Sequence, residues 1–147
     1  MTVLDLIGSR AEVYSIRHDT TVHDAARYLR ERQVRAVGVL DEHGHLVGVV
    51  SQSDISDKVA AENKCPAWMR VGEIMSTGLV TVTPDRTAAD CLRLMEQHGF
   101  YHLLVVDGDD RYRGMLSVTD LLTVIASDEK ARADMLEAFM FERTPGA

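Results

Sequence analysis

The sequence is poor in cysteine, in basic residues and in long apolar runs, and each shortage argues against a class of protein. Its two cysteines, Cys65 and Cys91, have neither the density of a disulfide framework nor the spacing of a metal site. Apolar runs such as 121–126 fall far short of the roughly 20 residues of a membrane-spanning helix, and residues 1–5 lack the features of a signal peptide. We therefore expect a cytoplasmic protein without a membrane partner, in which Cys91 is a small core residue.

The balance of charge is acidic, with 16 Lys and Arg against 23 Asp and Glu and a net charge of −7. Nonspecific nucleic-acid binding depends on clustered basic residues that neutralise phosphates, so we expect no nucleic-acid partner. An anionic ligand would have to find local positive potential. The length of 147 residues suits one compact domain or two small lobes that share an interface.

One stretch of the chain occurs twice, and the rest of the sequence follows it. Gly48–Asp54 reads G-V-V-S-Q-S-D, and Gly114–Asp120 reads G-M-L-S-V-T-D. The offset is 120 − 54 = 66, and it carries residues 13–55 onto 79–121 without a gap, with nine identities. Many of the other pairs exchange one apolar residue for another. The chain is therefore one supersecondary unit written twice.

Each copy predicts a strand, an amphipathic helix, two strands and a second helix. The first helices begin at the Thr-x-x-Asp signals of Thr21 and Thr87, and Gly99 is the expected C-cap in the second copy. In the first copy we expect strands at 13–16, 37–40 and 46–51 and the second helix at 55–61. In the second copy the corresponding strands are 79–82, 103–106 and 112–117, and the second helix is 121–125. The predicted organisation is 1–62 as repeat one with a lead-in helix, 63–70 as a linker, 71–126 as repeat two, and 127–147 as a C-terminal amphipathic helix and tail.

The repeated heptad admits two interpretations. Where a strand ends in a hydroxyl residue and a helix follows, the backbone N–H groups at the start of the helix point toward any ligand above the strand end. Such a helix start favours an anion. Asp54 and Asp120 can each accept two hydrogen bonds from the vicinal hydroxyls of a ribose. Ser51-x-x-Asp54 and Ser117-x-x-Asp120 also fit a capping box, which needs no ligand. Capping does not account for the repeated glycine, which permits close approach of a ligand or of neighbouring backbone, nor for the second hydroxyl.

The doubled unit, the lead-in V-G-E-I-M-S, the stretch V-T-V-T-P-D at 80–85, G-F-Y-H-L-L-V-V-D at 99–107 and both heptads resemble a tandem pair of CBS domains, the Bateman module. The resemblance covers residues 3 to about 126. It implies an α/β fold of two β-α-β-β-α repeats about a pseudo-two-fold axis, and a non-catalytic protein. It also implies an adenosine-containing regulatory ligand, such as AMP, ADP, ATP, NAD or S-adenosylmethionine, bound in clefts between the repeats of a homodimeric sensor, and no cofactor.

The resemblance also implies roles for individual residues. Ribose binding falls on Asp54 and Asp120, phosphate or ribose-hydroxyl contacts on Ser51, Ser53, Ser117, Thr119, His102 and Arg35, and the adenine pocket on Ile16, Val82, Ala36, Gly48 and Gly114. The sequence departs from the family where Arg-His, an apolar residue and Pro are usual. Residues 101–104 read Tyr-His-Leu-Leu and residues 35–38 read Arg-Ala-Val-Gly. The missing arginine in repeat two disfavours a triphosphate there, and one of the two sites could be degenerate.

The remaining features favour neither metal binding nor catalysis. His43 and His45 lie two apart in a polar turn without a third ligand, and no nucleophile has an identifiable base. We therefore expect no catalytic residue and no metal. An enzyme that acts on a nucleotide is the hypothesis that the sequence favours least. The apolar face of 127–142 either packs at a dimer interface, offers a helix to a protein partner or folds back on the same chain. The alternative to a sensor is a dimerising adaptor without a ligand, in which Ser and Asp only cap helices.

Overall fold

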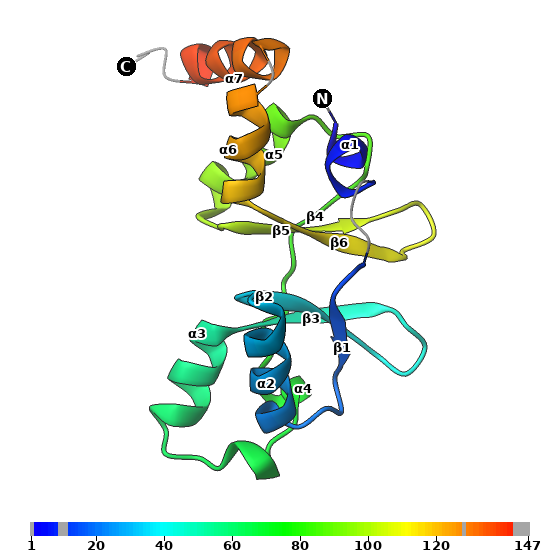
Figure 1. The fold of residues 1–147 in the computed structure, drawn as a ribbon, viewed down its shortest axis with the longest axis vertical. Coiled ribbons are helices and arrows are strands. Elements are labelled where there is room, and N and C mark those ends of the chain that lie inside the picture. Colours follow the sequence, from blue (N-terminus) through cyan, green and yellow to red (C-terminus); the bar gives the residue numbers. More distant parts are fainter. Residues whose placement is uncertain (1, 9–11, 128, 143–147) are drawn as a thin grey trace. The chain divides into compact units, whose positions relative to one another are not determined.

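The protein contains two three-stranded sheets, each with helices beside it, as the computed structural model shows (Figure 1). The model describes residues 2–8, 12–127 and 129–142. The first sheet has the order β1 (Ser15–Arg17), β2 (Ala36–Leu40), β3 (Leu46–Ser51), and the second β4 (Thr81–Val82), β5 (His102–Val106), β6 (Tyr112–Ser117). In both sheets the first two strands run parallel, and β2 pairs antiparallel with β3. The predicted α/β class with two copies of one unit is confirmed.

The helices follow the repeat closely. The first helix of each copy is α2 (Val22–Arg32) or α5 (Ala88–His98). The second is α3 (Gln52–Ile55), which continues into the π-helical turn η1 (Ser56–Ala60), or α6 (Val118–Ser127). The lead-ins are α1 (Val3–Ile7) and α4 (Val71–Ile74), the segment between the copies holds the 3-10 turn η2 (Pro66–Trp68), and α7 (Glu129–Glu142) ends the described chain.

Local signals account for where α2 and α5 begin and end. Thr21 Oγ1 accepts a hydrogen bond from the Asp24 N–H, and Thr87 Oγ1 accepts one from the Asp90 N–H, both at 3.1 Å. The helix α5 ends at Gly99, whose φ of 68° lies in the left-handed region that glycine enters without strain. The predicted helix starts at Thr21 and Thr87 and the C-cap at Gly99 are therefore confirmed.

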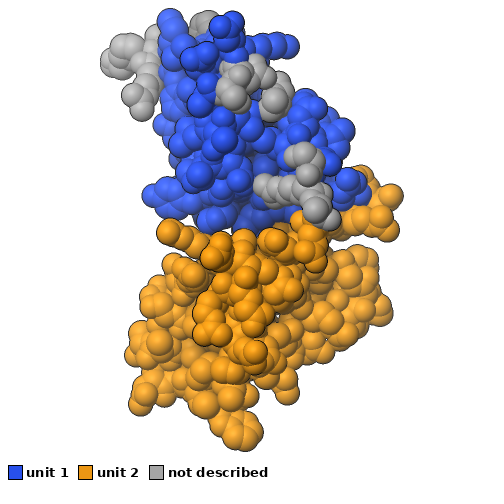
Figure 2. Space-filling view, in the orientation of Figure 1, with its two compact units in different colours: residues 1–11, 81–107, 113–147 blue, residues 12–80, 108–112 orange. Residues whose placement is uncertain are grey.

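The chain divides into two compact units that do not follow the sequence order of the repeats (Figure 2). One unit combines residues 1–11 with 81–107 and 113–147, and the other combines 12–80 with 108–112. The lead-in α1 therefore lies with the second repeat, where the Val3 N–H bonds to the Arg86 carbonyl at 2.8 Å. The lead-in α4 lies with the first repeat, where the Val71 N–H bonds to the Thr20 carbonyl at 2.8 Å. Each lead-in helix thus completes the unit built on the other repeat.

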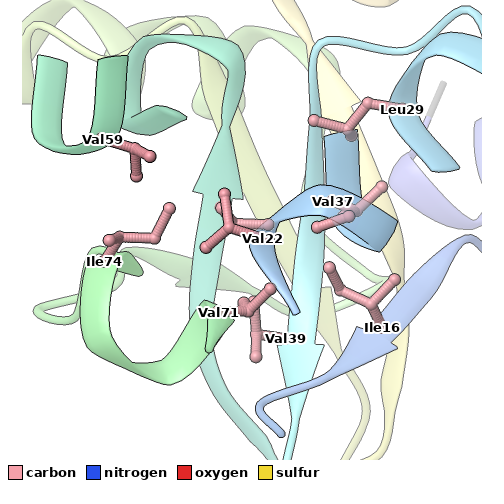
Figure 3. Packing of buried hydrophobic residues seen from close by; sticks show 10 residues of the cluster. Ile16, Val22, Leu29, Val37, Val39, Val59, Val71 and Ile74 are labelled. Atoms are coloured by element: carbon pink, nitrogen blue, oxygen red, sulfur yellow. The ribbon is translucent and has the colours of Figure 1, made fainter. Parts of the chain in front are cut away.

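The unit built on the first repeat has a core of aliphatic side chains from its sheet, α2, η1 and α4 (Figure 3). Its members are Ile16, Val22, Ala25, Leu29, Val37, Val39, Val50, Val59, Val71 and Ile74. Tyr112 belongs to the same unit and packs against Gly38, where a Cβ atom would lie 2.6 Å from the ring carbon Cζ. The absence of a side chain at Gly38 therefore leaves room for the ring of Tyr112.

The unit built on the second repeat buries a matching set of side chains. Leu103, Val105 and Leu116 come from its strands, Cys91 and Met95 from α5, and Leu121 and Ile125 from α6. The helix α7 contacts both α5 and α6, so the C-terminal segment folds back on its own unit. Leu136 and Met140 nevertheless remain exposed on α7, at 58% and 73% of their surface.

Candidate functional site

The first heptad forms a tight junction between a strand and a helix. Strand β3 ends at Ser51, which is the N-cap of α3, and Ser51 pairs across the sheet with Ala36. The Gln52 N–H donates to the carbonyl of Arg35 at 2.9 Å. The structure therefore brings Arg35, Ala36, Ser51 and Asp54 together at this junction. The Arg35 side chain is exposed.

Asp54 lies at the centre of this junction, and both of its carboxylate oxygens accept hydrogen bonds from the protein. Oδ2 accepts from the Ser51 N–H at 2.9 Å and from Ser51 Oγ at 3.1 Å, while Ser51 Oγ accepts from the Asp54 N–H at 3.2 Å. Oδ1 accepts from Ser76 Oγ at 3.3 Å. Asp54 is only 7% exposed and is the one buried charged side chain among the described residues. The capping box that the sequence allowed is therefore present.

Lys58 supplies the countercharge for Asp54. Its Nζ lies 3.0 Å from Asp54 Oδ1 and donates to the carbonyl of Ile74 at 2.8 Å. Lys58 lies one turn after Asp54, at the i+4 spacing that brings side chains together on a helix. The ammonium group thus connects the end of α4 to the carboxylate beneath it. A buried carboxylate needs such a partner, because desolvation of an unpaired charge is costly.

Gly48 permits close approach of a neighbouring segment of the chain. A Cβ atom at this position would lie 2.5 Å from Met75 Sδ and 3.1 Å from the Ser76 carbonyl oxygen. Ser76 pairs with Val49 through two backbone hydrogen bonds, of 2.8 and 3.0 Å. Of the two reasons that the sequence offered for this glycine, neighbouring backbone is the one that the structure shows.

The second heptad forms the same junction with different surroundings. The Ser117 N–H donates to Asp120 Oδ2 at 2.9 Å, and the Asp120 N–H donates to Ser117 Oγ at 3.1 Å. The Val118 N–H donates to the carbonyl of Tyr101 at 3.0 Å, which matches the contact of Arg35 in the first copy. Tyr101 is 73% exposed, and Gly114 has a φ of 133°, a value that side chains disfavour. Asp120 is half-buried and more accessible than Asp54.

The other residues that the resemblance assigns to a ligand divide into two groups. Ser53 and Thr119 are exposed beside the helix starts, and His102 is half-buried at the first position of β5. Ile16 and Val82 are buried in the cores of their own units, at 8% and 3% exposure. The side chains of Ile16 and Val82 are therefore part of these cores, and their role in binding a base stays a prediction.

Sequence reasoning missed Lys58 and Ser76. The i+4 spacing of Asp54 and Lys58 could have indicated their ion pair. The comparison of the two copies drew attention only to repeated residues, and position 58 corresponds to Val124 in the second copy. No local signal indicates Ser76, which reaches Asp54 from 22 residues away through the tertiary fold. These two side chains make the first junction chemically different from the second.

The histidines near the first hairpin lie beside surface carboxylates. His18 Nε2 lies 3.1 Å from Glu42 Oε2, and His45 Nδ1 lies 3.6 Å from Asp41 Oδ2. The backbone N–H groups of His45 and His43 hold the pKa of Asp41 below its ordinary value. Among the residues whose placement is described, no three His, Cys, Asp or Glu side chains are grouped to hold a metal ion. Within the same residues no helix is long and apolar enough to cross a membrane.

Two strand–helix–strand–strand–helix copies with equivalent Ser-x-x-Asp junctions define a tandem-repeat α/β module. A family model of the CBS domain matches residues 4–61 and again 71–127. The chain therefore belongs to the CBS-domain family and carries a tandem pair of these domains, as the sequence resemblance predicted.

Relatives and solved structures agree with this assignment. The chain is 33% identical over 122 residues to the magnesium transporter MgtE of Thermus thermophilus, which covers 80% of this chain and 26% of the transporter. A putative signal-transduction protein with CBS domains from Burkholderia ambifaria has a TM-score of 0.79 at 26% identity, over 88% of this chain and 96% of that one.

The CBS domain pair of protein MJ0100, solved with 5-methylthioadenosine and S-adenosyl-L-methionine, has a TM-score of 0.76 at 24% identity, over 86% of this chain and 97% of that one. These structural similarities show that the chain has the fold of a CBS-domain pair. The chain spans between 18% and 65% of the length of the first curated relatives that it matches.

Proposed function

We propose that this CBS pair is a non-catalytic regulatory module that binds an adenosine-containing ligand and senses a metabolite or the energy state of the cell. The observation that carries the proposal is the repeated junction at which a strand ends in Ser51 or Ser117 and a carboxylate follows in the first helical turn. A ribose offers two adjacent hydroxyl groups to such a carboxylate. Hydrogen bonds to a charged acceptor contribute about 1.5–3 kcal/mol.

The surroundings of Asp120 support a ligand with few phosphate groups. The exposed ring of Tyr101 lies in the position that Arg35 has in the first copy, so the second junction lacks that cation. His102 and Thr119 remain as polar groups beside the helix start. The MJ0100 pair shares the fold and was solved with two adenosyl ligands, which makes this ligand class the first to test.

The regulatory role rests on the kind of protein in which such pairs occur. The relative in Thermus thermophilus is a magnesium transporter, and the pair matches only 26% of it. A ligand can regulate an attached or associated protein only if it binds one conformer more tightly than another. We expect a homodimer in the cytoplasm, in which Leu136 and Met140 of α7 contribute apolar surface to the dimer or to a protein partner.

Isothermal titration with AMP, ADP, ATP, NAD and S-adenosylmethionine tests the ligand. We expect at least one of them to bind more tightly than about 1 mM, which corresponds to about −4 kcal/mol. Asp120→Ala should abolish or strongly weaken that binding, while the capping position Thr87→Ala, in the same unit, should leave it unchanged. Failure of all five ligands to bind at this level would reject the sensor for this ligand class.

The second candidate function is a ligand-free dimerising adaptor. The capping boxes of Asp54 and Asp120 favour it, because they give both carboxylates a structural role. It predicts that none of the five ligands raises the melting temperature and that Asp120→Asn leaves partner binding intact. A rise in melting temperature with any of the five, lost in Asp120→Ala, would exclude the adaptor.

A further inference from the structure

A hollow lies between α2 and α3 in the unit built on the first repeat. It has a volume of about 290 Å³ and opens to solvent. Three of the side chains that line it are small, those of Ala26, Ser56 and Ala60, and the buried Leu29 forms part of its apolar lining. The exposed Arg30 also lines it. This surface therefore offers a binding partner both space for an apolar side chain and a positive charge.

The second repeat has larger and acidic side chains at the equivalent positions. The offset of 66 that relates the two copies leads from Ala26, Ser56 and Arg30 to Leu92, Leu122 and Glu96. The offset holds in the fold as well, because Val59 and Ile125, which it also relates, are both buried. Leu122 is 50% exposed and Glu96 is exposed, although α7 contacts the same two helices, α5 and α6. The second repeat therefore presents an apolar side chain and a negative charge where the first has a hollow and a positive charge.

We infer that these two surfaces bind each other in a head-to-tail dimer, with α5 and α6 of one copy of the chain on α2 and α3 of the other. Leu122 enters the hollow beside Ser56, and Glu96 pairs with Arg30. Each chain carries both surfaces, so the contact occurs twice when the dimer closes around a two-fold axis. This inference deepens the homodimer of the proposed function and rests on it.

Pairing of like repeats is the alternative arrangement of two copies. Around a two-fold axis it sets Arg30 against Arg30 and Glu96 against Glu96, and like charges placed opposite each other disfavour an interface. It also leaves the hollow without a side chain to fill it, so the atoms that line it lose their packing contacts. Both the charges and the sizes of the side chains therefore favour the head-to-tail arrangement.

Sedimentation equilibrium of charge variants tests the pairing of Arg30 with Glu96. Arg30→Glu and Glu96→Arg each place like charges in both contacts, so each alone should raise the dissociation constant of the dimer about tenfold or more. The double variant exchanges the two charges and should return the dissociation constant to within about threefold of wild type. Single variants with the affinity of wild type, or a double variant as weak as the single ones, would overturn the inference.

Leu122→Ser tests the apolar contact, and Leu4→Ser is its matched control. Both leucines are 50% exposed and belong to the same unit, but Leu4 lies on α1, away from the proposed surface. Leu122→Ser should raise the dissociation constant of the dimer about tenfold or more, and Leu4→Ser should change it less than about twofold. A dimer that tolerates both changes equally would contradict the inference.

Disulfide trapping determines the orientation directly. In a Cys65→Ser background, which removes the exposed native thiol, chains with Ser56→Cys and chains with Leu122→Cys are oxidised separately and as an equal mixture. We expect covalent dimers mainly in the mixture, joined between position 56 of one copy and position 122 of the other. Covalent dimers that form as readily from either variant alone would show pairing of like repeats and overturn the inference.

The wild-type protein separates failure of this inference from failure of the proposed function. A dimer whose affinity none of the variants at positions 30, 96 and 122 changes would overturn this interface and leave the homodimer standing. A chain that stays monomeric at about 100 μM would overturn both the interface and the homodimer. Ligand binding is judged by its own titration in either case.

Discussion

Gly48→Ala should destabilise the unit built on the first repeat, although alanine is the smallest possible addition. The new methyl group would lie 2.5 Å from Met75 Sδ, 2.9 Å from Met75 Cγ and 3.1 Å from the Ser76 carbonyl oxygen. The methionine side chain can turn aside, because it is unbranched and flexible. The Ser76 carbonyl cannot move freely, since it accepts the Val49 N–H at 3.0 Å and the Ser76 N–H donates back at 2.8 Å.

The size of the effect follows from three contributions. Overpacking of a filled site costs about 1–3 kcal/mol. Weakening one of the two Val49–Ser76 hydrogen bonds costs about 0.5–1.5 kcal/mol more. Replacement of glycine by alanine restricts the unfolded chain, which offsets about 0.4–1 kcal/mol. Together these ranges predict a net loss of about 0.5–4 kcal/mol in the free energy of unfolding, with a midpoint of about 2 kcal/mol.

Urea unfolding monitored by circular dichroism measures this loss, and Gly108→Ala is the matched control. Gly108 belongs to the same unit, its φ is not in the left-handed region, and no atom lies within 4 Å of the position of its Cβ. Its substitution should change the free energy of unfolding by less than about 0.5 kcal/mol. If Gly48→Ala were as stable as wild type, the glycine would not be required by Met75 and Ser76, and space for a ligand would again be its best explanation.

Three further predictions concern pH and packing. The backbone N–H groups of His45 and His43 lower the pKa of Asp41 in the folded protein. Its carboxylate therefore stabilises the fold above the ordinary value of 3.8, and this effect is lost as the pH falls through the folded pKa. Asp41→Asn should lower the melting temperature at pH 7, and the difference from wild type should shrink as the pH falls below 3.8. Burial raises the pKa of the Cys91 thiol from 9.0 to about 12, so the stability that depends on the neutral thiol should decline between pH 9 and 12, and less so in Cys91→Ala. A thiol reagent at pH 8 should accordingly label the exposed Cys65 at once and Cys91 only on unfolding. Leu29→Ala should cost about 2–5 kcal/mol in urea unfolding, because Leu29 is only 2% exposed.

The repeat made most of the fold predictable from the sequence. Local signals such as the Thr21 cap and Gly99 act within a few residues, and the structure has both where they were expected. Strands β3 and β6 have the predicted bounds. Several other ends shifted by one to three residues, as at β1, which spans Ser15–Arg17 instead of 13–16. Such shifts arise because strand ends depend on partners across the sheet, here the pairing of Arg17 with Leu40.

The sequence did not predict that each lead-in helix packs with the other repeat. Both lead-ins have the same apolar pattern, and a pattern does not say which of two similar units a helix completes. The choice is made by backbone contacts such as those from Val3 to Arg86 and from Val71 to Thr20. The contact of Ser76 with the first heptad could not be predicted for the same reason. Ser76 reaches Asp54 only because α4 lies with the first repeat.

The measurement that tests the central proposal most directly compares AMP with 2′-deoxy-AMP on wild-type protein by isothermal titration. In the proposed site the vicinal hydroxyls of the ribose bind the carboxylate of Asp120, so loss of one hydroxyl should remove a hydrogen bond worth about 1.5–3 kcal/mol. We expect 2′-deoxy-AMP to bind about 10-fold to 150-fold more weakly than AMP, and Asp120→Asn to reduce that difference. Equal affinity for the two nucleotides would contradict the account and leave the Ser-x-x-Asp junctions as helix caps alone.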